Sequence, residues 1–333
     1  MLNYLARRIA VAIAILLAVS FAVYLIFAIL PFDPAALTCG KNCNDPAIIE
    51  ANRVRLGYDL PIWQQYITFL KGLFVGRTFG EGAATIFCPA PSFGYSYQEH
   101  ACVTNAIIDA LPVTLSLAIG ALVLWLILGV GLGIVAARHR GRTADTGSTI
   151  FVLIGTSLPT FVTGLLLLVF VVVKWRILPY PSGNYTPLFE SPLEWLNTMI
   201  LPWITLAFAY AALYTRFVRN AVIETLSEDF IRTARAKGLS EKVVLRKHTL
   251  RAALAPLTTM AGLDFAGLLG GAILTEAVFN LPGLGRLSLG AVVDFDLPII
   301  VATTILAAAI VIFMNLLVDI LYAFIDPRVR VAA

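Results

Sequence analysis

Residues 227–256 read SEDFIRTARAKGLSEKVVLRKHTLRAALAP and form the longest charge-rich segment of a chain that is otherwise mostly apolar. Ser227 is expected to cap a first helix, because Asp229 follows in the first turn, where a carboxylate suits the positive end of the helix dipole. Gly238 is expected to end that helix, and a second helix then runs toward Pro256. The sequence therefore predicts a helix–glycine–helix elbow between two apolar runs.

The composition on either side of this elbow is that of a membrane protein. The chain has 333 residues, of which 59% are hydrophobic and 13% charged, whereas a soluble domain carries about 25% charged residues. The sequence contains several apolar runs of about 20 residues, each long enough to cross roughly 30 Å of hydrocarbon. The runs are continuous rather than alternating, so they predict helices and not a barrel. The fold class is therefore an all-α membrane protein.

Six spans are predicted from these runs. The first is retained and is not a signal peptide, because its apolar run is too long and no small-residue cleavage site follows. Pro159 is expected to kink the third span. The predicted spans are 9–30, 111–137, 147–173, 198–215, 254–279 and 297–325.

The distribution of basic residues orients this topology. About two thirds of the 24 Lys and Arg residues fall in the segments assigned to the cytoplasm. Both termini are therefore expected in the cytoplasm, and the net charge of +4 does not indicate nucleic-acid binding. The predicted parts are 1–30 (N-terminus and first span), 31–103 (extracytoplasmic loop domain), 104–326 (core, spans two to six, with the elbow) and 327–333 (cytoplasmic tail).

All four cysteines, Cys39, Cys43, Cys88 and Cys102, fall in the predicted loop domain. An even number in one loop predicts two disulfides in an oxidising compartment. Three pairings are possible, and loop closure favours Cys39–Cys43 with Cys88–Cys102. A zinc site requires a tighter ligand spacing, and His100 is the only histidine nearby, so zinc is less favoured.

The elbow resembles a motif of a known transporter family. Residues 232–238 read RTARAKG, and nine residues later the sequence continues with HTL at 248–250. This pattern resembles the EAA loop of ABC-importer permeases, and TARAKGLS resembles the B-type subunits of the peptide/nickel (Opp/Dpp) family. Arg232 and Thr233 replace the Glu and Ala of the general loop, and Arg251 replaces its Pro, which narrows the resemblance to the peptide branch. The alternative is an ordinary basic loop on the cytoplasmic side.

The resemblance implies a fold, a site and partners. It implies a type I, MetI-like permease with five core spans plus the first helix. It also implies a coupling helix that docks in a groove of a cytoplasmic ATPase. The expected partners are a second, C-type permease subunit, two ATP-binding subunits, an extracytoplasmic substrate-binding protein and the lipid bilayer of a bacterial inner membrane. The implied coupling residues are Asp229, Thr233, Ala234, Arg235, Ala236, Lys237, Gly238, Leu239 and Ser240.

The predicted loop domain contains two amphipathic helices, over 47–56 and 62–74, separated by a turn. Residues 81–101 are an insertion rich in Pro, Gly and aromatic residues. We expect a stapled surface loop that faces the binding protein; a rigid cap without a partner is the alternative.

Three acids fall within predicted spans, Asp264, Glu276 and Asp319, where an ionisable group costs about 2.5–3.5 kcal/mol on insertion scales. Asp264 is surrounded by glycines and is expected either to line the translocation path or to make a structural hydrogen bond. Glu276 begins a stretch that resembles the family's Glu-x-x-Phe-x-x-Pro-Gly-Leu-Gly signature, which implies a gate, with a capped turn as the alternative. Asp319 is expected to make structural contacts.

No catalytic constellation or metal set is found in the sequence. The chain is therefore not expected to be an enzyme or to bind a cofactor, and ATP and Mg²⁺ are expected in the partner subunits. The competing function is a secondary transporter driven by an ion gradient, which would use Asp264 and Glu276 as ion sites. It predicts two inverted repeats of broken helices, and no internal repeat is visible. The substrate is left open between dipeptides, longer peptides, nickel and other small solutes.

Overall fold

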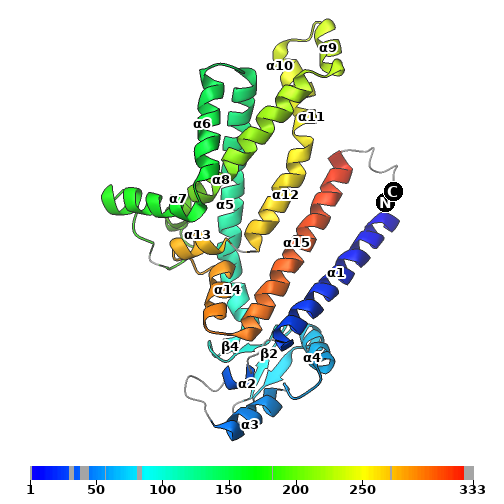
Figure 1. Ribbon diagram of the computed structural model, residues 1–333, viewed down its shortest axis with the longest axis vertical. Helices are drawn as coiled ribbons and strands as arrows, with labels where there is room; N and C mark the ends of the chain where they lie inside the picture. Colours follow the sequence, from blue (N-terminus) through cyan, green and yellow to red (C-terminus); the bar gives the residue numbers. More distant parts are fainter. Residues whose placement is uncertain are drawn as a thin grey trace. The chain divides into compact units, whose positions relative to one another are not determined.

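The computed structural model is mostly helical (Figure 1). It describes residues 2–29, 34–37, 45–56, 58–80, 85–181, 183–270 and 272–325. Four of the described helices are long and apolar enough to cross a membrane, and up to six spans result if each of two bent helix pairs counts as one. The predicted six-span, all-helical fold is confirmed within this range.

The elements follow one another in chain order. The first part contains α1 (Leu2–Ile29), α2 (Pro34–Leu37), α3 (Pro46–Leu56), α4 (Ile62–Val75), β1 (Arg77–Phe79), β2 (Ile86–Cys88), β3 (Tyr95–Ser96) and β4 (Ala101–Cys102). The middle contains α5 (Val103–Arg138), α6 (Thr143–Ser157), α7 (Thr160–Leu167), η2 (Leu168–Lys174) and α8 (Pro192–Leu226). The last part contains α9 (Asp229–Ala236), α10 (Glu241–Val243), η3 (Val244–Thr249), α11 (Leu250–Ala253), α12 (Ala255–Leu269), α13 (Ile273–Val278), α14 (Leu284–Val293) and α15 (Leu297–Ile325).

Two compact units make up the chain, and each is described by itself. Unit 1 consists of residues 1–114 and 282–313, and unit 2 of residues 115–281 and 314–333. Unit 1 therefore contains α1, the described residues between α1 and α5 (below, the loop domain), α14 and most of α15.

The start of α5 packs against α14 and α15 in the core of unit 1. Val103 on α5 and Ile299 on α15 are almost completely buried in one cluster with Leu284 of α14. The Leu284 backbone N–H donates to the Thr114 hydroxyl at 2.8 Å, so the side chain of α5 satisfies one of the free amides at the start of α14. Helix α14 lies between the predicted fifth and sixth spans, in residues 280–296, where the sequence analysis assigned no helix.

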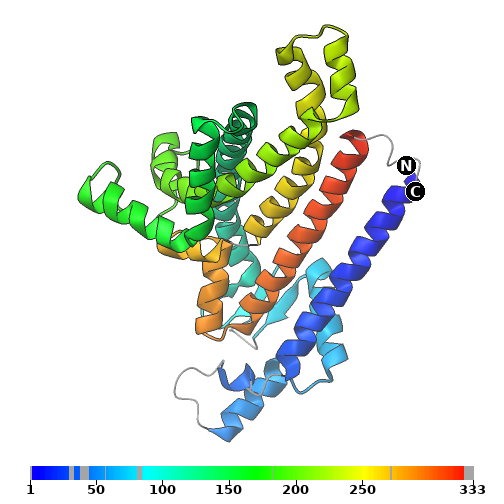
Figure 2. The same ribbon diagram turned by 45° about the horizontal axis from the view of Figure 1, so that its top comes forward.

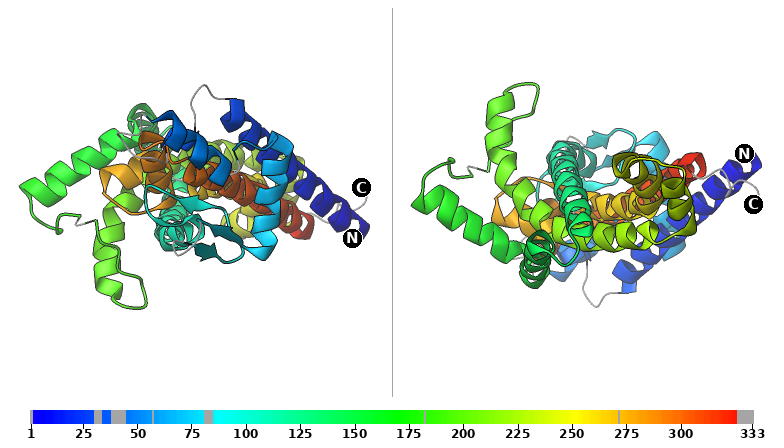
Figure 3. Two further views of the ribbon diagram at one scale, coloured as in Figure 1. Left: turned by 90° about the horizontal axis from the view of Figure 1, so that it is seen from below. Right: turned by 90° about the horizontal axis from the view of Figure 1, so that it is seen from above.

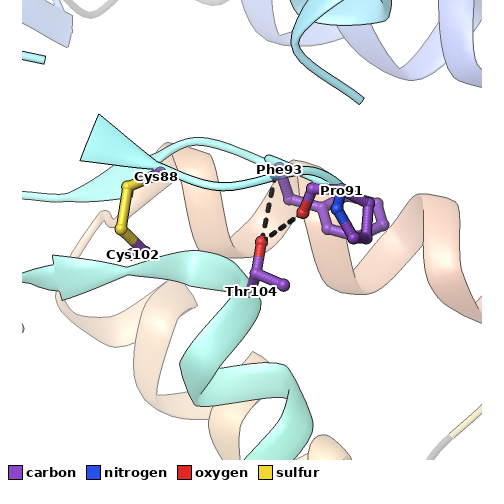
Figure 4. Close-up of a disulfide and its surroundings, with 5 residues drawn as sticks. All are labelled: Cys88, Pro91, Phe93, Cys102 and Thr104. Carbon is purple, nitrogen blue, oxygen red and sulfur yellow. Dashed lines mark hydrogen bonds between the residues drawn. A yellow bond between two sulfur atoms is a disulfide. The ribbon is translucent and has the colours of Figure 1, made fainter. Parts of the chain in front are cut away.

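The insertion in the loop domain is a pair of small hairpins. β1 pairs with β2 and β3 with β4, both antiparallel. Cys88 and Cys102 are joined by a disulfide, as predicted (Figure 4). The Thr104 hydroxyl donates to the Pro91 carbonyl at 2.6 Å and accepts from the Phe93 amide at 3.4 Å. Cys39 and Cys43 lie outside the described residues, so their pairing stays a prediction.

The second hairpin has mostly buried strands and an exposed turn at 98–100. Ser96 is buried and donates a short hydrogen bond to Asp296, at the turn into α15. Tyr95 packs beside the disulfide, and a Cβ on Gly94 would lie 3.3 Å from Pro298. The strands of this hairpin are therefore part of the packing of unit 1 beside the start of α15, and only its turn at 98–100 is exposed as expected of a surface loop.

In unit 2, α5 and α6 approach α8 through glycines. A Cβ on Gly120 would meet the Trp203 ring at 2.0 Å, and one on Gly133 would meet Val218 at 2.7 Å. On α6, a Cβ on Gly155 would meet Ala212 at 2.6 Å. Small residues allow helix axes in a membrane to pack closely, so these glycines set the contact surface of α8.

The third predicted span is broken rather than kinked. α6 and the α7–η2 helix meet at 101° where Leu158 and Pro159 interrupt the helix (Figure 3). Pro159 is the N-cap residue of α7, where its missing N–H needs no partner, so the proline starts a new helix instead of bending one. The expectation of a simple kink is therefore wrong.

Other boundaries differ in smaller ways. α15 has the predicted bounds, whereas α8 begins at Pro192, six residues before the predicted fourth span. The predicted fifth span consists of two helices, since α12 ends at Leu269 and α13 begins at Ile273. The third and fifth apolar runs were each predicted as a single helix, and each consists of more than one helix in the structure.

Candidate coupling elbow and path residues

The charge-rich segment follows α8, and Ser227 at this junction caps a different helix from the one predicted. α8 continues to Leu226, and the Ser227 hydroxyl donates to the Glu224 carbonyl at 2.6 Å. Ser227 therefore satisfies the C-terminal end of α8. Glu228 is the N-cap residue of α9 and makes no side-chain capping bond. The prediction that Ser227 caps the following helix is wrong.

The turn between α9 and α10 follows the prediction. Lys237 is the C-cap of α9, and Gly238 follows with φ +78°, a left-handed conformation that glycine adopts without strain. The Gly238 amide donates to the Arg235 carbonyl at 2.9 Å. Ser240 then precedes α10 as its N-cap residue in an extended conformation. A helix–glycine–helix elbow is therefore present.

A small buried core joins the two arms of the elbow. Ile231 of α9 and Val244 of η3 are fully buried against each other, together with Ala234, and Leu226 at the end of α8 packs on them. Both arms and the end of α8 therefore share one core, so packing as well as the chain itself connects the elbow to α8.

An ion pair connects the same arms on the surface. The Arg235 Nε donates to Glu241 Oε1 at 2.7 Å, and Nη2 donates to Oε2 at 3.3 Å. Both side chains are exposed, so the pair contributes little free energy, at most about 1 kcal/mol. Because two hydrogen bonds join the same two side chains, the pair fixes the direction of the Arg235 side chain.

The second arm contains a π-helical segment that sequence reasoning missed. η3 covers Val244–Thr249, and the buried Thr249 hydroxyl donates to the Val244 carbonyl at 3.2 Å. A π segment inserts an extra residue into a helix and often marks a functional site. No residue pattern in 241–253 separates this segment from an ordinary α-helix.

The exposed face of the elbow combines apolar and basic side chains. Phe230 is 46% exposed, and Leu239 and Val243 are also exposed. The exposed basic side chains around them are Arg232, Lys237, Lys242, Arg246 and Lys247. In Figure 1 the elbow, with α9 and α10, lies beyond the end of α8. Exposed large apolar side chains on such a charged segment make it a candidate docking surface for another protein.

The structure places the predicted coupling residues in four groups. Ala234 is buried in the core of the elbow, whereas Gly238 and Ser240 form its turn. Asp229 starts α9, and its carbonyl accepts from the Thr233 hydroxyl at 3.0 Å. The remaining members are exposed: Arg235, Ala236, Lys237 and Leu239.

The two predicted path residues lie in different environments. Asp264 of α12 is partly exposed, and its Oδ2 accepts from the Tyr214 hydroxyl of α8 at 2.6 Å. Glu276 of α13 is fully buried. Whether either lines a path stays a prediction. The side chain of Asp319 lies outside what the structure describes.

Aromatic residues surround the partner of Asp264, and sequence reasoning did not select them. Tyr214 and Trp125 are fully buried, and the Trp125 ring stacks on Tyr210 at 4.6 Å between centroids. Such residues cannot be selected from an apolar run, because a tyrosine inside a span is indistinguishable from an ordinary core residue until the acceptor of its hydroxyl group is known. Among the described residues, no group of three or more His, Cys, Asp or Glu side chains could hold a metal ion.

Comparison with known proteins identifies the family. The family model for the binding-protein-dependent transport system inner membrane component matches residues 129–331, and the model for the N-terminal part of such components matches residues 1–118. A protein of Brucella abortus (strain 2308) named for a peptide transport system permease is 37% identical over 329 residues, 97% of this chain and 98% of its own. The glutathione transport system permease protein GsiC of Escherichia coli K12 is 38% identical over 338 residues, 99% of each chain.

A solved structure shares the fold. The methionine ABC transporter MetNI, in inward-facing conformations, aligns with a TM-score of 0.52 over 67% of this chain and 97% of its own, at 18% identity. These findings favour the ABC-permease interpretation over a transporter driven by an ion gradient. The chain belongs to the family of binding-protein-dependent transport system inner membrane components, as a multi-pass permease of the peptide-transporter branch with the type I importer fold.

Proposed function

We propose that this chain is the B-type permease subunit of an ATP-driven importer of peptides. It forms half of the translocation path, pairs with a C-type permease and receives substrate from an extracytoplasmic binding protein. The name of the Brucella abortus relative supports a peptide substrate. In this proposal ATP is hydrolysed by two cytoplasmic partner subunits, and the elbow at residues 229–240 is where they dock.

The elbow faces the cytoplasm in this proposal. Its basic residues, together with Arg138, Arg140 and Arg142 at the α5–α6 corner, give that side the excess of positive charge expected of cytoplasmic loops. Both chain termini then lie in the cytoplasm, and the loop domain lies outside.

The shared core of the elbow is the observation that carries the mechanism. Ile231 and Val244 bind the two arms to each other and to the end of α8 at Leu226. When the ATPase subunits close on ATP, a displacement of α9 therefore moves α8 rather than only the turn. A rigid-body shift of packed helices then exchanges inward-open and outward-open states.

Backbone strain at Gly238 tests this coupling. A Cβ at position 238 would meet no atom within 4 Å beyond its chain neighbours, so Gly238→Val acts mainly through the left-handed φ of +78°. Gly141 provides a matched control, because it has φ +74° and equally open surroundings in the α5–α6 turn. We expect Gly238→Val to uncouple ATP hydrolysis from uptake in the reconstituted transporter, while Gly141→Val transports normally. Equal transport by both variants would contradict the proposal.

The source of energy is tested separately. Uptake should be abolished by vanadate, which traps ABC ATPases, and should persist when ion gradients are dissipated. If uptake continues in the presence of vanadate and stops when the ion gradient is dissipated, the chain would instead act as a secondary transporter.

A further inference from the structure

Helix α4 in the loop domain contacts two membrane spans at a depth that a water-exposed helix would not reach. The Tyr66 hydroxyl lies 2.7 Å from Ser20 Oγ and donates to the Leu17 carbonyl at 3.1 Å, both on α1. Leu17 and Ser20 belong to the apolar span Ala6–Ile26. At 1.5 Å per residue, these contacts lie about 9–14 Å inside the Ile26 end of the span.

The second span gives the same depth independently. Phe69 of α4 is buried in one cluster with Val23 of α1 and with Val301 and Ile305 of α15. The α15 span begins at Leu297, so the two α15 contacts lie about 6–12 Å inside it. Side-chain length accounts for part of this reach, which is the reach expected of a helix at the boundary between headgroups and acyl chains. Figure 2 shows α4 (light blue) beside the lower half of α1 (dark blue).

The face of α4 that points away from both spans has the composition of this boundary. Trp63, Ile67, Lys71 and Phe74 follow at helical spacing and are all exposed, Ile67 by 54% and Phe74 by 82%. Such an apolar face would be unfavourable in water on a helix of an extracytoplasmic domain. Tryptophan is enriched at membrane interfaces, and a lysine stem can cross apolar surroundings to place its charge in the headgroups.

Two further polar side chains of α4, Thr68 and Gln65, have hydrogen-bond partners within the protein. The Thr68 hydroxyl donates to the Gln64 carbonyl at 2.8 Å. The Gln65 side chain donates to the Leu60 carbonyl at 2.8 Å and accepts from the Tyr24 hydroxyl at 3.4 Å. Internal partners of this kind are what a helix needs in a layer with little water.

The exposed face of α1 continues the same apolar surface. Only 11% of the α1 span is buried, and Ile13, Leu17 and Phe21 are exposed along it. Because Tyr66 joins α4 to α1 at Leu17, the lipid-facing surface of the span passes directly into that of α4. This continuity favours lipid over a soluble partner as the occupant.

We propose that α4 is an interfacial membrane helix. Its face of Trp63, Ile67, Lys71 and Phe74 contacts the acyl chains of the leaflet next to the loop domain. The helix thereby holds α1 and anchors the disulfide-linked hairpins at a fixed depth. This inference needs only that the chain spans a membrane, and it is independent of the substrate and of the ATPase.

Collision of a nitroxide with oxygen and with a water-soluble nickel chelate measures the environment of this face. Ile67→Cys is spin-labelled in the whole transporter, with Cys39 and Cys43 replaced by serine and the Cys88–Cys102 disulfide retained. The protein is reconstituted in phosphatidylethanolamine–phosphatidylglycerol vesicles. Glu50→Cys on α3, whose native side chain is 60% exposed, serves as the control in water.

Oxygen, which concentrates in lipid, should relax the label at position 67 more than the nickel chelate does, and the order should reverse at position 50. Stronger nickel relaxation at 67 would place α4 in water and overturn the inference. Protection from both reagents would show that another protein subunit covers the face and would also overturn it. Phe74→Cys repeats the measurement if the first variant does not assemble.

Discussion

Arg219 of α8 holds Asp145 of α6 by two parallel hydrogen bonds, Nε to Oδ1 at 2.6 Å and Nη2 to Oδ2 at 2.9 Å. The same carboxylate accepts from the Gly141 amide at 2.9 Å, so it also fixes the turn that precedes α6. Asp145 is buried and Arg219 is partly exposed. One ion pair therefore connects the α5–α6 corner to the helix that carries the elbow.

Loss of this pair should loosen the corner. We expect Asp145→Asn to destabilise the protein by about 1.5–3 kcal/mol, because it removes the negative charge and one of the two acceptor oxygens and leaves the guanidinium charge partly buried without its counterion. Glu50→Gln is the matched control, since its partner Arg53 lies at 2.9 Å on the surface, where a pair contributes about 0–1 kcal/mol. Thermal unfolding of both variants in detergent measures the difference. Equal losses would show that burial of Asp145 has no energetic consequence.

Two glycines of α5 should respond oppositely to alanine. A Cβ on Gly120 would overlap the Trp203 ring at 2.0 Å, so Gly120→Ala must displace α8 and should cost about 1–3 kcal/mol. A Cβ on Gly131 of the same helix meets nothing within 4 Å, so Gly131→Ala should be neutral or stabilise by up to about 1 kcal/mol. Unfolding temperatures of the two variants provide the test, and a harmless Gly120→Ala would mean that α5 and α8 pack less closely.

Separate variants of Asp264 and Tyr214 distinguish a path residue from a structural one. We expect Tyr214→Phe to reduce stability by about 1–2 kcal/mol, because it removes the donor at 2.6 Å from a fully buried site. If Asp264 lines the path, Asp264→Asn should change the substrate dependence of uptake while retaining an acceptor for Tyr214. Uptake kinetics and unfolding are measured for both variants and for the double variant. Parallel effects on stability alone would assign Asp264 a structural role.

Unit 1 should be more stable in acid because of Asp296. Burial raises the pKa of this carboxyl above its usual value, although the hydrogen bond from Ser96 opposes the shift. A raised folded-state pKa means that the folded chain binds the proton more tightly than the unfolded chain. The stabilisation is complete below the unfolded pKa and is lost as the pH rises through the folded one.

This dependence can be measured by unfolding the protein across that pH range. The unfolding free energy should fall with rising pH by no more than about 1.4 kcal/mol per pH unit for a single group. Asp296→Asn, which still accepts from Ser96 and does not titrate, should flatten the slope. An unchanged slope in that variant would show that Asp296 is not the group responsible.

The sequence by itself determined the spans, the elbow and the family. Apolar length decides whether a helix can cross a bilayer, and α15 has the predicted bounds for that reason. Gly238 was also identifiable in advance, since a glycine after a charged helix end signals a left-handed turn. Such features depend on residues within a few positions of one another, so local pattern is sufficient to find them.

Only the tertiary structure decided how distant residues meet. The pairing of Asp145 with Arg219, of Tyr214 with Asp264 and of Ser96 with Asp296 joins residues far apart in the chain. The position of α4 beside two spans depends in the same way on packing against α1 and α15. Hydropathy reports how apolar a segment is, not what its side chains contact, and it is these contacts that separate a water-exposed helix from one in the membrane interface.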